Sequence, residues 1–176
     1  MMSGYERVYA ARMNAITEIA VPAASRLHAR LPGAHFHDAY RMALPDDRPV
    51  LALFLDSVRR TPRWVNRLMA LRNAVVAPLG LKNLGGLNEV DAVKPVAAYR
   101  PGDRVGIFTL LHVSDDEVIL GDADRHLDVQ VSLCRLGEDV AVSTVVHVHR
   151  LLGHLYMLPV APLHRRIVPA VMRRMG

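Results

Sequence analysis

The alternation of apolar and polar side chains first becomes regular in residues 37–44, which end before Pro45. A period of two is typical of a strand with one buried face. Before this segment the chain has a short apolar stretch at 16–21, and residues 23–31 predict one or two helical turns. We therefore expect the fold to begin near residue 16 and to place its first clear strand at 37–44.

Helical spacing replaces this alternation after residue 46. Apolar residues recur every four positions from Val50 to Val58. Thr61 and Pro62 then provide an N-cap residue and a first-turn proline, a common helix start. The apolar stripe that follows consists of Trp64, Leu68, Leu71 and Val75. We predict two short helices joined by a tight corner.

The region from 93 to 149 favours strands. Residues 93–99 predict a weak strand. Further strands are predicted at 104–113, 117–120, 127–134 and 140–149, because these segments are rich in β-branched residues and are separated by turn residues. The clearest alternation in the chain lies at 127–134, where leucine and valine occupy every second position. The whole pattern indicates a β-meander.

In the last segment, residues 153–175, apolar residues recur every four positions from Leu163 to Met175. Pro162 is compatible with a helix start, whereas Pro169 should kink the helix. Since helices and strands occupy separate parts of the chain, we predict an α+β fold. A curved antiparallel sheet would wrap around a long C-terminal helix, with two short helices after the first strand. Such a sheet and helix can enclose an apolar cavity.

Composition supports one folded domain. The chain has 176 residues, of which 51% are hydrophobic and 22% charged, as in globular proteins. We place the domain at 16–176, after a leader at 1–15. The net charge is +5, but the arginines are scattered or paired rather than clustered in runs, so no nucleic-acid partner is expected. The single Cys134 excludes an internal disulfide.

Neither a secretory signal nor an apolar run of about 18 residues occurs in the sequence, so we expect a cytoplasmic protein. Four arginines near the end lie among apolar residues, at positions 165, 166, 173 and 174. They suit the solvated face of a packed helix or, alternatively, contact with an anionic membrane. The oligomeric state is left open, with a homodimer among the alternatives.

Three motifs carry a family resemblance. Residues 64–82 (WVNRLMALRNAVVAPLGLK) resemble a W..LM.LRN…LGLK pattern, 121–128 (GDADRHLD) resemble G.DD.HLD, and 144–166 resemble a strand that runs into G.LYM…P.HR. Together they resemble the bacterial domain-of-unknown-function family 2867 over residues 16–175. The resemblance implies a START-like, Bet v 1-like (SRPBCC) helix-grip fold with a cavity, and it implies no particular reaction. Val129, Gln130 and His154 depart from the family pattern.

His126 and Asp128 are the first candidates for chemistry. They lie two apart on a predicted strand and would share one face. If that face lines the cavity, His126 would transfer a proton and Asp128 would set its tautomer. The alternative is that both face solvent or bond backbone groups at the start of a strand.

We expect no bound metal and no other cofactor. Two groups of residues nevertheless have the chemistry of metal ligands. One consists of Asp122, Asp124, His126 and Asp128, and the other of His147 and His149 with His112 or His126. The first lacks the glycine and the terminal acid of a calcium loop, and the second needs a third ligand from elsewhere. Histidines paired within the sheet are the simpler interpretation.

A second set of candidates would contact a ligand. It consists of Trp64, Leu68, Leu71, Asn73, His147, Tyr156 and Met157. The apolar stripe of the second helix would be either ordinary core or the lid of a cavity. Asn73 would bond a ligand or backbone groups, and Tyr156 offers one hydroxyl on an apolar body, which suits a mostly apolar pocket.

These features predict that the protein binds a small apolar or amphipathic molecule between the sheet and the last helix. One alternative is an enzyme of the cyclase, isomerase or dehydratase type on the same scaffold, with His126 and Asp128 as its proton-transfer residues. Another is a peripheral membrane or protein-interaction module.

Overall fold

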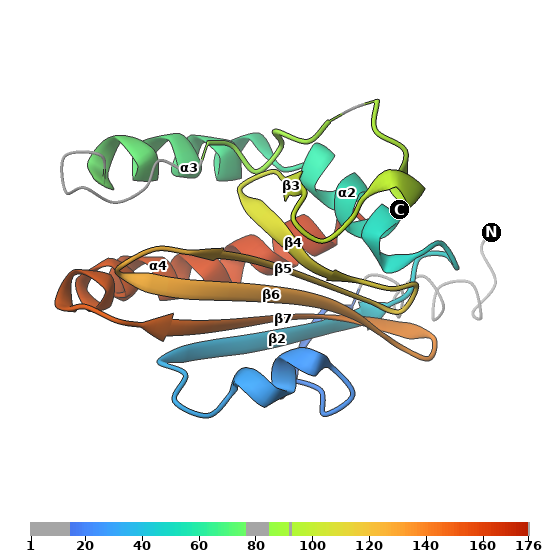
Figure 1. The fold of residues 1–176 in the computed structure, drawn as a ribbon, viewed down its shortest axis with the longest axis horizontal. Coiled ribbons are helices and arrows are strands. Elements are labelled where there is room, and N and C mark those ends of the chain that lie inside the picture. Colours follow the sequence, from blue (N-terminus) through green and yellow to red (C-terminus); the bar gives the residue numbers. More distant parts are fainter. Residues whose placement is uncertain (1–14, 77–84, 92, 176) are drawn as a thin grey trace, which may run out of the picture.

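The computed structural model describes residues 15–76, 85–91 and 93–175. Within these ranges one antiparallel sheet has the strand order β1-β2-β7-β6-β5-β4-β3 (Figure 1). The strands are β1 (Thr17–Glu18), β2 (Phe36–Ala43), β3 (Arg104–Val105), β4 (Phe108–Val113), β5 (Glu117–Ala123), β6 (Leu127–Leu136) and β7 (Asp139–Val148). The helices are α2 (Val50–Arg59), α3 (Arg63–Val76) and α4 (Leu151–Met172), with 3₁₀ turns η1 (Arg26–Arg30) and η3 (Val96–Ala98). The predicted α+β class, the curled antiparallel sheet and the long C-terminal helix are confirmed.

The centre of the sheet is its most buried part. Strand β7 pairs with β2 along one edge and with β6 along the other, and all its residues from Val140 to Val146 are buried. A strand covered on both faces favours β-branched residues at successive positions, as this valine-rich segment has. α4 covers one face of the sheet, and η1 packs on β6 and β7 with Leu27 fully buried.

The first helix of the predicted pair lies within the core, where nearly every residue of α2 is buried. The corner between the helices is present, but Thr61 does not cap α3 as predicted. Its hydroxyl donates to the Val58 carbonyl at 2.6 Å, because the open end of α2 offers a free acceptor at this corner. The stripe of α3 is not core either, since Trp64 is 42% exposed and Leu71 is 60% exposed.

Two predicted strands were wrong in detail. Residues 93–99 contain η3 instead of a strand, because Pro95 lacks an N–H and Val93 is 88% exposed, which leaves no apolar face to bury. Residues 104–113 form β3 and β4 rather than one strand. Gly106 separates them with φ +58, and a Cβ there would lie 2.4 Å from the Leu87 carbonyl oxygen. Only glycine fits such a turn against the backbone.

Strand β5 is longer than the predicted 117–120 and continues to Ala123. The pairing with β6 continues through Gly121↔Gln130 and Ala123↔Asp128, because the ten-residue β6 offers backbone partners along that whole length. This extension places Asp122 on a strand.

Helix α4 runs through Pro159, Pro162 and Pro169, of which only the last was expected to distort it. Each proline frees the carbonyl of the residue four positions earlier. Those residues, Leu155, Leu158 and Arg165, are all exposed, so water can bond the freed carbonyls and the helix continues. No described helix is both long and apolar enough to cross a membrane. The predicted leader at 1–15 lies outside the described residues except for Ala15.

Candidate functional site

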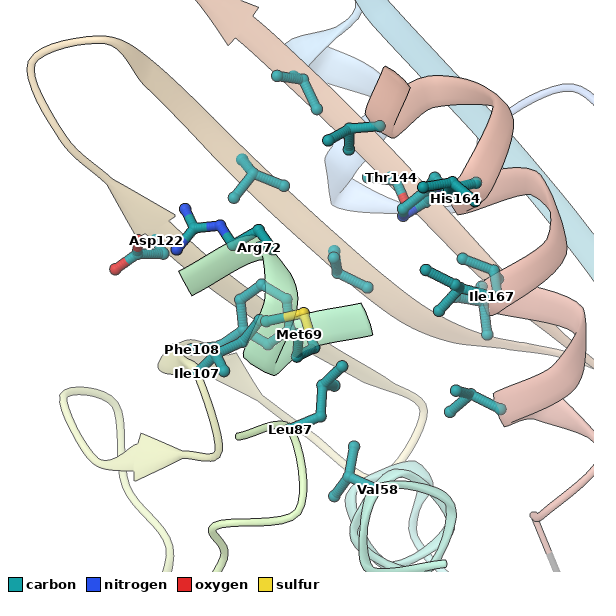
Figure 2. Close-up of a pocket in the computed structure, with 18 of the residues that line it drawn as sticks. Val58, Met69, Arg72, Leu87, Ile107, Phe108, Asp122, Thr144, His164 and Ile167 are labelled. Atoms are coloured by element: carbon teal, nitrogen blue, oxygen red, sulfur yellow. The ribbon is translucent and has the colours of Figure 1, made fainter. Parts of the chain in front are cut away.

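A cavity of about 240 Å³ lies between the sheet, α3 and α4 (Figure 2). Its walls are mainly apolar side chains from α2, β6, β7 and α4. Helix α3 and Leu87, from the segment at 85–91, lie on another side. Polar side chains interrupt the walls at Ser57, Arg72, Asp122, Asp124, Thr144, Tyr156 and His164. A largely apolar hollow with a few polar groups is the usual character of a small-molecule site.

Strand alternation builds the sheet side of this cavity. Leu127, Val129, Val131 and Leu133 of β6 line it, as do Val142, Thr144 and Val146 of β7. The two sets face the same way because they are cross-strand partners, for example Val131↔Thr144. The intervening residues of β6, among them Asp128, therefore point to the opposite face. The period-two pattern predicted at 127–134 is thus confirmed, and it separates the two faces of the strand.

Helical periodicity builds the opposite side. Tyr156, Met157, Val160, Leu163, His164, Ile167, Val168, Val171 and Met172 of α4 line the cavity. They recur at intervals of three and four residues and so form one face of the helix. From α3 the lining residues are Leu68, Met69 and Arg72.

One polar cluster lies where β2, β7 and α4 meet, and consists of Asp38, Thr144 and His164. His164 Nδ1 lies 2.9 Å from Asp38 Oδ2, and the side chains are 23% and 1% exposed respectively. Asp38 and Thr144 are paired across β2 and β7. Asp38 Oδ1 and Thr144 Oγ1 are buried and have no hydrogen-bond partner within the described residues. The Phe36 ring packs edge-on against the imidazole, with centroids 5.6 Å apart.

The electrostatic effect of Asp38 extends to Tyr40 on the same strand. Burial raises the pKa of the Tyr40 phenol, and the carboxylates of Asp38 and Glu18 raise it further. Tyr40 therefore stays a neutral hydroxyl throughout the physiological range.

A second polar cluster involves α3 and α4. Arg72 Nε donates to the Tyr156 hydroxyl at 3.2 Å, and the guanidinium carbon lies 5.4 Å from the centroid of the tyrosine ring. Figure 2 shows Arg72 and Asp122 on one side of the cavity and Thr144 and His164 on the other. The cavity therefore has an apolar middle and polar groups on two sides.

His126 and Asp128 are not brought together. His126 lies in the bend before β6 rather than on the strand, so the expectation that the two share a strand face is wrong. Asp128 forms an ion pair with Arg30 on the face away from the cavity. His126 is 5% exposed, and its Nε2 bonds Arg125 Nε at 2.9 Å. Neither side chain is among those that line the cavity.

The predicted ligand contacts divide into two groups. Leu68, Tyr156 and Met157 line the cavity, whereas Trp64, Leu71, Asn73 and His147 do not. Asn73 accepts from Arg72 Nη1 at 2.9 Å and donates to the Gly85 carbonyl at 3.1 Å, so it links α3 to the following segment. His147 lies on the outer face of β7, with Nε2 3.3 Å from the Pro32 carbonyl.

Asp38, Thr144 and His164 were missed in the sequence. A signal for Asp38 was present, because it alternates in phase with Phe36, Tyr40 and Met42, and a charged residue in phase with buried positions is unusual. Its partner His164 lies 126 positions away, which no local pattern reveals. Within the described residues, no three His, Cys, Asp or Glu side chains are grouped closely enough to hold a metal ion.

Comparison with protein-family models matches residues 30–171 to the family described as Protein of unknown function (DUF2867). The matched range extends from η1 into the last turn of α4 and so includes most of the cavity walls. The searches of curated proteins and of solved structures gave no match.

Proposed function

The chain belongs to the DUF2867 family, whose description assigns no activity, and from this premise we propose that it binds a small apolar or amphipathic molecule in the cavity between the sheet and α4. The observation that carries the proposal is the cavity itself, about 240 Å³ with mostly apolar walls. Close packing normally fills a core of this kind with side chains. An apolar hollow of this size is a stable feature when a ligand occupies it.

The character of the walls limits the ligand. The volume lies just below the usual range of ligand pockets, about 300–1,000 Å³, so we expect a small molecule. Its body would contact valine, leucine and methionine side chains from β6, β7 and α4. Its polar group would reach one of the two polar clusters, since polar atoms elsewhere in the cavity would lose their hydrogen bonds to water.

The architecture supports a finer classification as part of the same proposal. A long C-terminal helix set against a curled antiparallel sheet, with a cavity between them, is consistent with the helix-grip fold of the START-like, Bet v 1-like (SRPBCC) superfamily. A bacterial origin and a cytoplasmic location belong to the proposal as well and rest on the sequence.

The alternatives receive less support. An enzyme that uses His126 and Asp128 is not favoured, because neither side chain lines the cavity. The exposed leucines of α4, at 151, 155 and 158, and the arginines at its end would suit a membrane or protein partner, but nothing in the structure indicates what covers them. Cavity binding is therefore the function that the geometry supports best.

Native mass spectrometry of the purified protein beside a denatured sample tests the proposal. We expect a one-to-one adduct that is lost on denaturation and that extraction identifies as a small, largely apolar molecule. If the protein is purified empty, titration with naphthalene, followed by the NMR shifts of the cavity methyl groups, replaces this measurement. A protein that carries no adduct and does not take up naphthalene would contradict the proposal.

A further inference from the structure

We propose that Asp38, Thr144 and His164 form a recognition site for a hydroxyl group, so that the ligand is an apolar alcohol or phenol. This inference rests on the proposed function and adds the chemical class of the ligand. It starts from Thr144 of β7 and His164 of α4, which both line the cavity. Asp38 of β2 contacts His164 and is paired with Thr144 across the strands.

The contact with Asp38 determines which ring nitrogen of a neutral His164 can accept a hydrogen bond. The Asp38 carboxylate is almost fully buried and lies 2.9 Å from Nδ1, and an ionised carboxylate only accepts hydrogen bonds. The proton of the imidazole is therefore placed on Nδ1, an assignment made from the hydrogen-bond network. In the neutral imidazole the other ring nitrogen, Nε2, is then an acceptor. It forms no hydrogen bond within the described residues.

Thr144 provides the matching donor. It lines the cavity, and its hydroxyl is buried without a hydrogen-bond partner in the part of the chain that the structure describes. Buried hydroxyls are nearly always bonded, so an unsatisfied one that faces a cavity indicates a partner that the protein itself does not supply. Asp38 is paired with Thr144 across the strands. Its Oδ1 atom is also buried without a hydrogen-bond partner among the described residues.

A hydroxyl is the group that satisfies both Nε2 and Thr144 Oγ1. It donates one hydrogen bond to Nε2 and accepts one from the threonine. A carbonyl or an ether can only accept, which leaves Nε2 without a donor. A carboxylate would in addition place a second negative charge near the buried Asp38. Most of the remaining lining residues are apolar and fit the hydrocarbon part of an alcohol or phenol.

Three probes with the same ring system test the inference: naphthalene, 2-naphthol and 2-methoxynaphthalene. We expect 2-naphthol to bind about fivefold to tenfold more tightly than either of the others, the effect of one or two additional hydrogen bonds. Thr144→Val keeps the branched shape and removes the hydroxyl, so it should reduce the ratio of 2-naphthol affinity to naphthalene affinity. Ser143→Ala is the matched control, because Ser143 is the neighbouring residue on the other face of β7 and also has an unpartnered hydroxyl.

The double variant Asp38→Asn/His164→Phe removes the charge and the ring nitrogens together and should abolish the preference. If the double variant does not fold, the affinities of Thr144→Val for the three probes test the inference by themselves. Equal affinity of the wild-type protein for all three probes would overturn this inference while the proposed function stood. A preference that persists in Thr144→Val and in the folded double variant would overturn the assignment to these residues. If no probe binds, the adduct found by native mass spectrometry decides. An adduct without a hydroxyl group overturns this inference alone, and the absence of any adduct overturns the proposed function and this inference together.

Discussion

Ser25 Oγ donates a 2.6 Å hydrogen bond to Glu117 Oε1 and so joins two residues 92 positions apart. Glu117 is 6% exposed, and the same oxygen accepts from Ser132 Oγ at 2.8 Å. The backbone N–H of Arg26 adds a further donor at 3.1 Å. A buried carboxylate is tolerated when donors surround it in this way. The cluster therefore attaches η1 to the outer face of the sheet.

Ser25→Ala should destabilise the protein by about 1–3 kcal/mol, because the change removes a donor to a buried charge and also the N-cap of η1. The cap is the hydrogen bond from Leu27 N to Ser25 Oγ, at 3.1 Å. The free energy of unfolding in urea measures the effect. Ser143→Ala is the control, since the hydroxyl of this fully buried serine has no partner within the described residues. The control should change stability little, and an equal loss in both variants would contradict the role given to Glu117.

Cys134 should resist alkylation while the protein is folded. Burial, together with the carboxylates of Glu117 and Asp116, raises the pKa of its thiol to about 11. At pH 8 only about one thiol in a thousand would then be the reactive thiolate. We expect iodoacetamide to react at least about a hundredfold more slowly with the folded protein than with the urea-unfolded protein. Comparable rates in the two states would refute the burial of this thiol.

The same shift gives a pH dependence. The folded pKa of Cys134 is higher than the ordinary value of 9.0, so between pH 9 and 11 the folded state holds the proton more firmly than the unfolded state. The stability that Cys134 contributes is therefore complete below pH 9 and is lost as the pH rises through this window. In Cys134→Ala the decrease in the free energy of unfolding between pH 9 and 11 should be smaller by this contribution. Urea unfolding at pH 8, 9, 10 and 11 measures the difference from the wild type.

Gly153→Ala should destabilise the protein although alanine favours helices. A Cβ at Gly153 would lie 2.7 Å from the His126 carbonyl oxygen and 2.7 Å from Val148 Cγ1. The gain in helix propensity is about 1 kcal/mol, whereas overpacking against backbone costs about 1–3 kcal/mol. Ala70→Gly, at an exposed position of α3, measures the propensity effect alone. Propensity by itself predicts opposite signs for the two variants, and we expect thermal unfolding to show a loss in both.

The elements that the sequence predicted well are those in which local pattern and burial agree. Strand β6 alternates because one face lines the cavity, and α2 carries apolar residues at helical spacing because it packs within the core. The errors arose where a distant group decides the outcome. Gly106 divides a strand because the Leu87 carbonyl approaches it, and Leu87 lies outside any window in which a strand is recognised.

The residues of the candidate site likewise divide into those that a local pattern predicts and those that only distant contacts bring together. Leu68 is predicted from the apolar stripe of the second helix, and Tyr156 and Met157 from their place on the C-terminal helix, and all three line the cavity. The spacing of His126 and Asp128 predicts a shared face only if both lie on one strand, but β6 begins at Leu127. Asp38 and His164 meet only through the fold, since 126 positions separate them.

A bulky side chain that fills the cavity should weaken ligand binding and leave the protein folded. Met157 and Leu158 are neighbours on α4, and Met157 lines the cavity whereas Leu158 is 71% exposed. Met157→Trp places a large ring in the hollow, so naphthalene should bind at least about tenfold more weakly, and the cost of overpacking should stay below about 3 kcal/mol because space is available. Leu158→Trp adds the same ring on the solvent side and should leave naphthalene affinity unchanged.

Fluorescence or NMR titration with naphthalene measures both affinities, and circular dichroism confirms that each variant is folded. The comparison is internal, because both substitutions add tryptophan to adjacent positions of one helix. A loss of binding in both variants would indicate that the probe occupies the exposed leucines of α4 rather than the cavity. A folded Met157→Trp protein that binds naphthalene as tightly as the wild type would place the apolar site elsewhere on the molecule and would remove the cavity as the basis of the function.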